Sequence, residues 1–223
     1  MASLPGTVRS ATPGAAGFDC STTLSQAALD AAVAANFTFC LRYVSYGETA
    51  QSDDLTTDEA TRILNAGLAL MAMYPWPGDA WPSPPSAALG TRNGARTVAH
   101  AQGVGLPGGV NIFLDLEGVP STVSAGNVIA YCNTWYDVVE AAGYIPGIYV
   151  GDSTQLSGDQ LYNDLKMQHY WKSGSDVPDI TTRGYQMVQS IPGNPPSIGG
   201  QTIDTNVTMT DRLGGNAQWL APN

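Results

Sequence analysis

Short apolar runs of strand-like composition recur along the whole chain, and in its first half they alternate with helix-like segments. Eight such runs cover residues 16–20, 37–44, 68–74, 110–117, 145–150, 167–171, 185–190 and 202–207. The helix-like segments have apolar residues at spacings of three and four, and cover residues 24–35, 58–66, 86–101 and 123–142. Alternation of strand and helix favours a parallel sheet, and eight parallel strands can close into a barrel.

The second half of the chain departs from this alternation. Residues 171–185 and 190–202 are short connections rich in Gly and Pro, which leave little room for a full crossover helix. We therefore predict an α/β fold, a modified TIM-like (β/α) barrel with reduced helices in its second half. The barrel is expected to span residues 17–213, between a flexible N-terminal segment (residues 1–16) and a C-terminal tail (residues 214–223).

The charge of the chain restricts its partners. The formal net charge is −10, and the nine Lys and Arg residues are scattered. Nucleic acids and anionic membranes select clusters of Lys and Arg, so we expect neither as a partner, whereas a neutral polymer such as a glycan is compatible. No window reaches transmembrane length, and residues 1–16 lack the basic start and apolar run of a signal peptide. Export to the cell envelope stays open, as does the oligomeric state.

The three cysteines, Cys20, Cys40 and Cys132, have no C-x-x-C spacing, so buried thiols are expected, although one pair could oxidise. No loop has the regular ligand spacing of a calcium site. We therefore predict neither a metal nor a cofactor.

The run at residues 111–118 ends in two carboxylates, Asp115 and Glu117, at positions i and i+2. In a strand these side chains share a face, while Leu114 and Leu116 point the other way. Asp and Glu are also common at strand ends as helix caps or solvated loop residues. Two neighbouring carboxyl groups are nevertheless the smallest set of side chains that general acid catalysis requires.

Other polar and aromatic residues fall at or near the ends of the remaining runs. In a parallel barrel the chemistry collects at the carboxyl ends of the strands, so we expect these residues to converge on one mouth. Asp19 and Asp204 would join Asp115 and Glu117 as the catalytic carboxylates. The candidate substrate-binding residues at the mouth are Arg42, Tyr43, Tyr74, Tyr149, Trp171 and Gln189.

Trp76 and Trp81 lie on a proline-rich loop at residues 74–85, which follows the third run. Exposed tryptophans on a stiff loop suit stacking on the C–H face of a sugar, and we predict that both bind substrate. The alternative is that one or both fold back over the barrel and cover its core.

Several short motifs carry a resemblance, namely Gly17-Phe18-Asp19-Cys20, Leu41-Arg42-Tyr43, Asp115-Leu116-Glu117, Gly147-Ile148-Tyr149 and the segments 170–171 and 185–189. In this order they are similar to the lysozyme barrels of glycoside hydrolase family 25. A closer resemblance, to the glycoside-hydrolase-like domain of unknown function found in actinobacterial cell-envelope and phage-related proteins, is carried by Gly17-Phe18-Asp19-Cys20, Leu41-Arg42-Tyr43 and Gly147-Ile148-Tyr149. The resemblance runs from about residue 17 to residue 211.

The resemblance implies a role for each carboxylate. Glu117 would be the general acid, and Asp115 would orient or polarise the 2-acetamido group of a sugar, with Asp19 and Asp204 beside them. The expected function is hydrolysis of an N-acetylated glycan, most plausibly peptidoglycan, by a lysozyme-like enzyme acting outside the cell or at its envelope. The alternatives are a non-catalytic glycan-binding module of the cell envelope that uses the same groove, and a scaffold with a plugged mouth.

Overall fold

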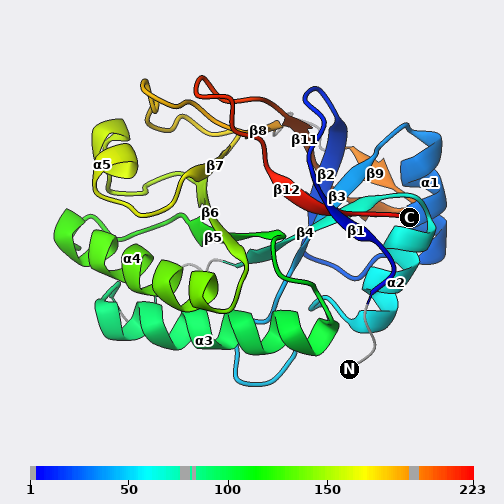
Figure 1. The fold of residues 1–223 in the computed structure, drawn as a ribbon, viewed down its shortest axis with the longest axis horizontal. Coiled ribbons are helices and arrows are strands. Elements are labelled where there is room, and N and C mark those ends of the chain that lie inside the picture. Colours follow the sequence, from blue (N-terminus) through cyan, green and yellow to red (C-terminus); the bar gives the residue numbers. More distant parts are fainter. Residues whose placement is uncertain (1–3, 76–80, 82–83, 191–195) are drawn as a thin grey trace.

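The computed structural model describes residues 4–75, 81, 84–190 and 196–223 and shows a closed eight-stranded barrel. The order around the barrel is β4-β3-β2-β11-β8-β7-β6-β5, and pairing of β4 with β5 closes it (Figure 1). The barrel strands are β2 (Ala16–Cys20), β3 (Phe39–Tyr43), β4 (Ala69–Tyr74), β5 (Asn111–Leu116), β6 (Ile145–Val150), β7 (His169–Lys172), β8 (Met187–Ser190) and β11 (Asp204–Thr208). Each of the eight predicted runs contains or overlaps one of these strands, so the predicted fold is confirmed.

The helices of the described residues lie in the first three quarters of the chain. They are α1 (Gln26–Ala34), α2 (Thr57–Asn65), α3 (Ala87–Val104), α4 (Ala125–Ala141) and the six-residue α5 (Gly158–Asn163). Each begins after a Ser or Thr whose side chain accepts a hydrogen bond from a backbone N–H of the first turn, which satisfies a donor that the helix leaves unpaired. After β7 the described connections contain only the small β9–β10 hairpin (Ser197–Ile198 and Gln201–Thr202), as the reduced second half predicted.

One strand runs against the predicted direction. β11 is antiparallel to both of its neighbours, β2 and β8, whereas the other neighbouring pairs around the barrel are parallel. Asp204 therefore begins its strand, and it still faces the mouth because it pairs in register with Asp19 near the end of β2. A parallel β11 would have placed Asp204 at the opposite end.

Alternation along each strand sorts side chains between the barrel interior and the layer beneath the helices. On β3, Phe39 and Leu41 belong to the interior cluster, while Cys40 packs in the outer one. Phe113, Trp171 and other large residues fill the interior, so the barrel is a packed core below its mouth.

The two ends of the chain are paired with each other, which corrects the prediction of a flexible segment and a loose tail. β1 (Thr7–Ser10) and β12 (Gln218–Ala221) form an antiparallel ladder, and β12 also pairs with β4 at Leu220 and Leu70. The Trp219 ring lies 5.5 Å from that of Phe39, at the end of the barrel opposite the mouth. Within the described residues, no helix combines the length and apolar character required to cross a membrane.

Candidate active site at the barrel mouth

A cavity of about 250 Å³ opens at the carboxyl ends of the parallel strands. It gathers side chains from six of the barrel strands and from three of the following loops. Its lining residues are Tyr43, Met73, Pro75, Asp115, Glu117, Tyr149, Ser175, Gln189 and Asp204. The structure thus brings together three of the four predicted carboxylates and three of the predicted substrate-binding residues.

Glu117 follows the last residue of β5 and is half-buried. Burial raises the pKa of its carboxyl, and the negative charges of Asp152 and Asp204 raise it further. The side chain lies against the backbone of Gly151, where an added Cβ would come 2.5 Å from Glu117 Oε2. The backbone is also held, because Trp81 Nε1 donates a hydrogen bond to the Glu117 carbonyl at 3.1 Å. Glu117 is therefore a positioned acid with a raised pKa.

Asp115 lies one pleat below Glu117 on the same face of β5. It is only 7% exposed and pairs in register with Tyr149 of β6. Tyr43 lines the same cavity, and the pKa of its phenol is raised by its own burial and by the charges of Asp19 and Asp115. The site therefore has a carboxylate pair with different environments, Asp115 deep and Glu117 near the opening.

Asp19 lies below the cavity and is buried among amides. Its Oδ2 accepts hydrogen bonds from Asn206 Nδ2 at 2.7 Å and Gln189 Nε2 at 2.9 Å. Burial outweighs these bonds and raises the pKa of Asp19 to about 7. Gln189 also accepts a bond from the Tyr149 hydroxyl at 2.7 Å, so Asp19 is connected to the cavity wall.

Asn206 was not among the predicted site residues. It shares the inward face of β11 with Asp204, and its Oδ1 accepts a hydrogen bond from Trp171 Nε1 at 2.8 Å. The signal that could have found it is the i, i+2 spacing of two polar residues on a barrel strand. Trp171 itself is fully buried below the cavity, where its indole orients Asn206.

Arg42 and Tyr74 end their strands as predicted but point away from the mouth. Arg42 is buried outside β3, where its Nε lies 2.7 Å from Glu59 Oε1 of α2. Tyr74 packs in the outer cluster, and its hydroxyl donates to the Tyr46 carbonyl at 3.4 Å. These two predictions are corrected by strand alternation. The inward residues at these strand ends are Tyr43 and Met73, and Arg42 does not pair with Glu117.

Trp81 is buried, which corrects its predicted role as an exposed stacking surface. It is 6% exposed, and its ring meets that of Tyr131 edge-on at 5.2 Å. This is the covering role that the sequence left open. Trp76, the other predicted stacking residue, lies outside the described residues.

Among the described residues, no group of three or more His, Cys, Asp or Glu side chains is arranged to hold a metal ion. The three cysteines are buried free thiols. The polar side chains that line the mouth cavity are carboxyl groups, phenols, the Gln189 amide and the Ser175 hydroxyl.

A protein-family model matches most of the chain. The sequence model of the Rv2525c-like, glycoside hydrolase-like domain matches residues 30–208, which include Asp115, Glu117 and Asp204. The chain belongs to this family. The Rv2525c-like match begins after Asp19, so that residue is assigned to the site by its contacts alone. No curated protein sequence gives a significant match.

Solved structures share the fold at low sequence identity. The Tat-secreted protein Rv2525c of Mycobacterium tuberculosis, in complex with L-tartrate, has a TM-score of 0.65 and 17% identity, covering 91% of this chain and 98% of that chain. An uncharacterized B. stearothermophilus protein has a TM-score of 0.64 and 20% identity over 90% and 97% of the two chains. The bacterial lysozyme from Streptomyces coelicolor has a TM-score of 0.63 and 16% identity over 91% and 95%. This Rv2525c-like chain therefore has the barrel of lysozymes.

Proposed function

We propose that this protein is a glycoside hydrolase that cleaves an N-acetylated glycan, with peptidoglycan as the substrate class. The observation that carries the proposal is the position of the half-buried Glu117 beside Asp115 in an open cavity, where burial and neighbouring carboxylates raise its pKa. A general acid must hold its proton at the working pH and reach the leaving oxygen. The pKa of Glu117 is shifted in the direction that the first requirement needs, and its place at the opening serves the second.

Asp115 is proposed to stabilise positive charge that develops at the sugar, or to orient the acetamido group that would react in its place. Its position one pleat below Glu117, in register with Tyr149 and lining the cavity, suits a group that acts on the sugar through charge or hydrogen bonding. Asp204 contributes to the raised pKa of Glu117, and Asp19 fixes Gln189 in the wall. These two residues are proposed to support the catalytic pair.

The cavity suits part of a polymer. Its volume of about 250 Å³ falls below the roughly 300–1,000 Å³ typical of sites that enclose a whole small molecule. One sugar ring would enter, with Tyr43 and Tyr149 as walls and the rest of the chain along the rim. Fold relatives include the Tat-secreted Rv2525c and a bacterial lysozyme, and we propose that this protein also acts on cell wall outside the cytoplasm.

The test is release of soluble, dye-labelled fragments from purified peptidoglycan, with Glu117→Gln as the inactive variant. The amide has nearly the volume of the acid but no transferable proton, so we expect turnover to fall by about 10²-fold or more. Glu140→Gln, on the exposed face of α4, is the matched control and should behave as wild type. Turnover by Glu117→Gln at the wild-type rate would refute the assignment.

Binding separates hydrolysis from the rival function. If wild type and Glu117→Gln bind glycan equally and neither releases fragments, the protein is a glycan-binding module of the envelope. Asp115→Asn adds a mechanistic test, with Asp30→Asn as an exposed control. A loss confined to substrates that carry the acetamido group would indicate substrate-assisted chemistry, whereas equal losses would indicate a direct electrostatic role.

A further inference from the structure

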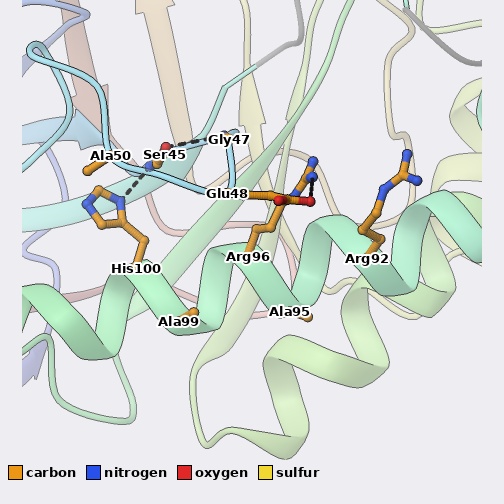
Figure 2. Close-up of a pocket in the computed structure, with 9 residues that line it drawn as sticks. All are labelled: Ser45, Gly47, Glu48, Ala50, Arg92, Ala95, Arg96, Ala99 and His100. Carbon is orange, nitrogen blue, oxygen red and sulfur yellow. Dashed lines mark hydrogen bonds and ion pairs between the residues drawn. The ribbon is translucent and has the colours of Figure 1, made fainter.

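A second cavity, of about 530 Å³, lies outside the barrel between α3 and the segment that follows β3 (Figure 2). One wall is formed by Ser45, Gly47 and Glu48, and the other by Arg92, Arg96 and His100. None of these residues belongs to the mouth cavity. The proposed hydrolase chemistry therefore does not use this cleft.

Helical spacing builds the basic wall. Arg92, Arg96 and His100 are four residues apart on α3 and so share one face of the helix, as Figure 2 shows. Ala95 and Ala99 lie beside them and leave space that longer side chains would fill. The cleft therefore combines a small apolar floor with two guanidinium groups.

The opposite wall is hydrogen-bonded to α3. The Ser45 backbone N–H donates a hydrogen bond to His100 Nδ1 at 2.5 Å, and the Ser45 hydroxyl donates to the Thr49 carbonyl at 3.1 Å. His100 is half-buried, which lowers its pKa and favours the neutral ring that can accept this bond. The cleft is thus preformed, which reduces the entropic cost of binding a ligand there.

The charge at this cleft is unusual for the molecule. The chain carries a net charge of −10, yet two of its nine Lys and Arg residues, Arg92 and Arg96, line this cleft. Glu48 is the acidic residue among those that line the cleft, and its Oε1 lies 3.0 Å from Arg96 Nη2; the charge of Asp54 acts on His100 from outside the lining. The Glu48 side chain is 84% exposed, and exposed ion pairs contribute little net free energy. An anion can displace it at small cost, and Arg92 is in no ion pair among the described residues.

We propose that this cleft binds a ligand bearing a carboxylate or phosphate group through Arg92 and Arg96, separately from the barrel mouth. The planar, multiply donating guanidinium group suits the oxygens of both anions.

The end of β4 connects the two sites. Met73 and Pro75 line the mouth cavity, while the Tyr74 hydroxyl donates to the Tyr46 carbonyl, which also accepts from Arg96 Nη1 at 3.4 Å.

The test is a titration of the full ¹⁵N-labelled chain with inorganic phosphate and, separately, with succinate, following the backbone amides of Ser45 and Gly47. Sodium chloride at matched ionic strength is the control for screening. We expect saturable shifts with at least one of the two anions. The stronger response identifies whether the ligand carries phosphate or carboxylate.

Variants locate the binding. Arg92→Gln should weaken it at least five-fold and the Arg92→Gln/Arg96→Gln double variant at least ten-fold, whereas Glu48→Gln should tighten it several-fold by removing the competing carboxylate. Arg212→Gln is the control, because this exposed arginine lies elsewhere, at a separate cavity beside Arg183. Shifts that follow only ionic strength, or equal affinity in Arg92→Gln and wild type, would overturn the proposal. Glu117→Gln should bind the anion normally, so failure of the proposed hydrolase activity would leave this result intact.

Discussion

Truncating Trp81 tests whether this residue positions the active site or stacks on sugar. Its ring is 6% exposed and packs edge-on against Tyr131 at 5.2 Å, so Trp81→Ala should lower the free energy of unfolding by about 3–5 kcal/mol. For a chain of this size each kcal/mol corresponds to roughly 2–4 °C in Tm, which predicts a decrease of roughly 6–20 °C. Tyr46→Ala, which removes an aromatic ring that is 48% exposed, is the control and should change Tm little.

Trp81→Phe separates packing from positioning. It keeps most of the ring but removes the N–H that donates to the Glu117 carbonyl at 3.1 Å, so it should cost about 1–3 kcal/mol. Because that bond holds the backbone of the proposed acid, we expect kcat on peptidoglycan to fall more than KM changes. Thermal melting and fragment release on both Trp81 variants provide the measurements. A Tm within 1 °C of wild type for Trp81→Ala, combined with weaker glycan binding, would refute the positioning role. It would indicate instead that Trp81 stacks on the sugar.

Three further perturbations address other parts of the site and its support. Gly151→Ala should lower turnover about ten-fold or more with a small change in Tm, because the new Cβ would lie 2.5 Å from Glu117 Oε2; wild-type turnover would show that the side chain has room to move. Glu59→Gln should destabilise the fold by about 3–5 kcal/mol, measured by urea unfolding, because it leaves the buried Arg42 charge without its carboxylate; a loss below about 1 kcal/mol would contradict this. The pKa of Asp19 is raised from 3.8 to about 7 on folding, so its contribution to stability is complete below pH 4 and is lost as pH rises to 7. Asp19→Asn should flatten that part of the stability profile, and an unchanged slope would contradict the shift.

The strands were predictable because each is a short apolar run bounded by polar or Gly-rich sequence. The direction of β11 was not, since the spacing of apolar residues is the same for a parallel and an antiparallel strand. Pairing of β1 with β12 was missed for a different reason. The two segments are more than 200 residues apart, and each is too short to show a pattern by itself.

The carboxylates of the site were predictable because strand-end acids in a barrel share one mouth. The inward or outward direction of each side chain was harder to predict. Helices cover the strands, so both faces of a strand are apolar and the sequence lacks the polar alternation that marks an exposed face. Arg42 was therefore assigned to the mouth, although it lies on the face of β3 that packs against α2.

The β1–β12 ladder has a practical consequence for how the protein can be attached to a surface. Both strands lie at the end of the barrel opposite the mouth, where Leu220 pairs with Leu70 near the start of β4. The carboxylates of the site lie at the mouth. A tether joined at either end of this chain would leave the mouth facing outward. Coupling through the C-terminus to a sensor chip should therefore keep the site accessible to insoluble glycan, provided that the linker leaves residues 218–221 paired.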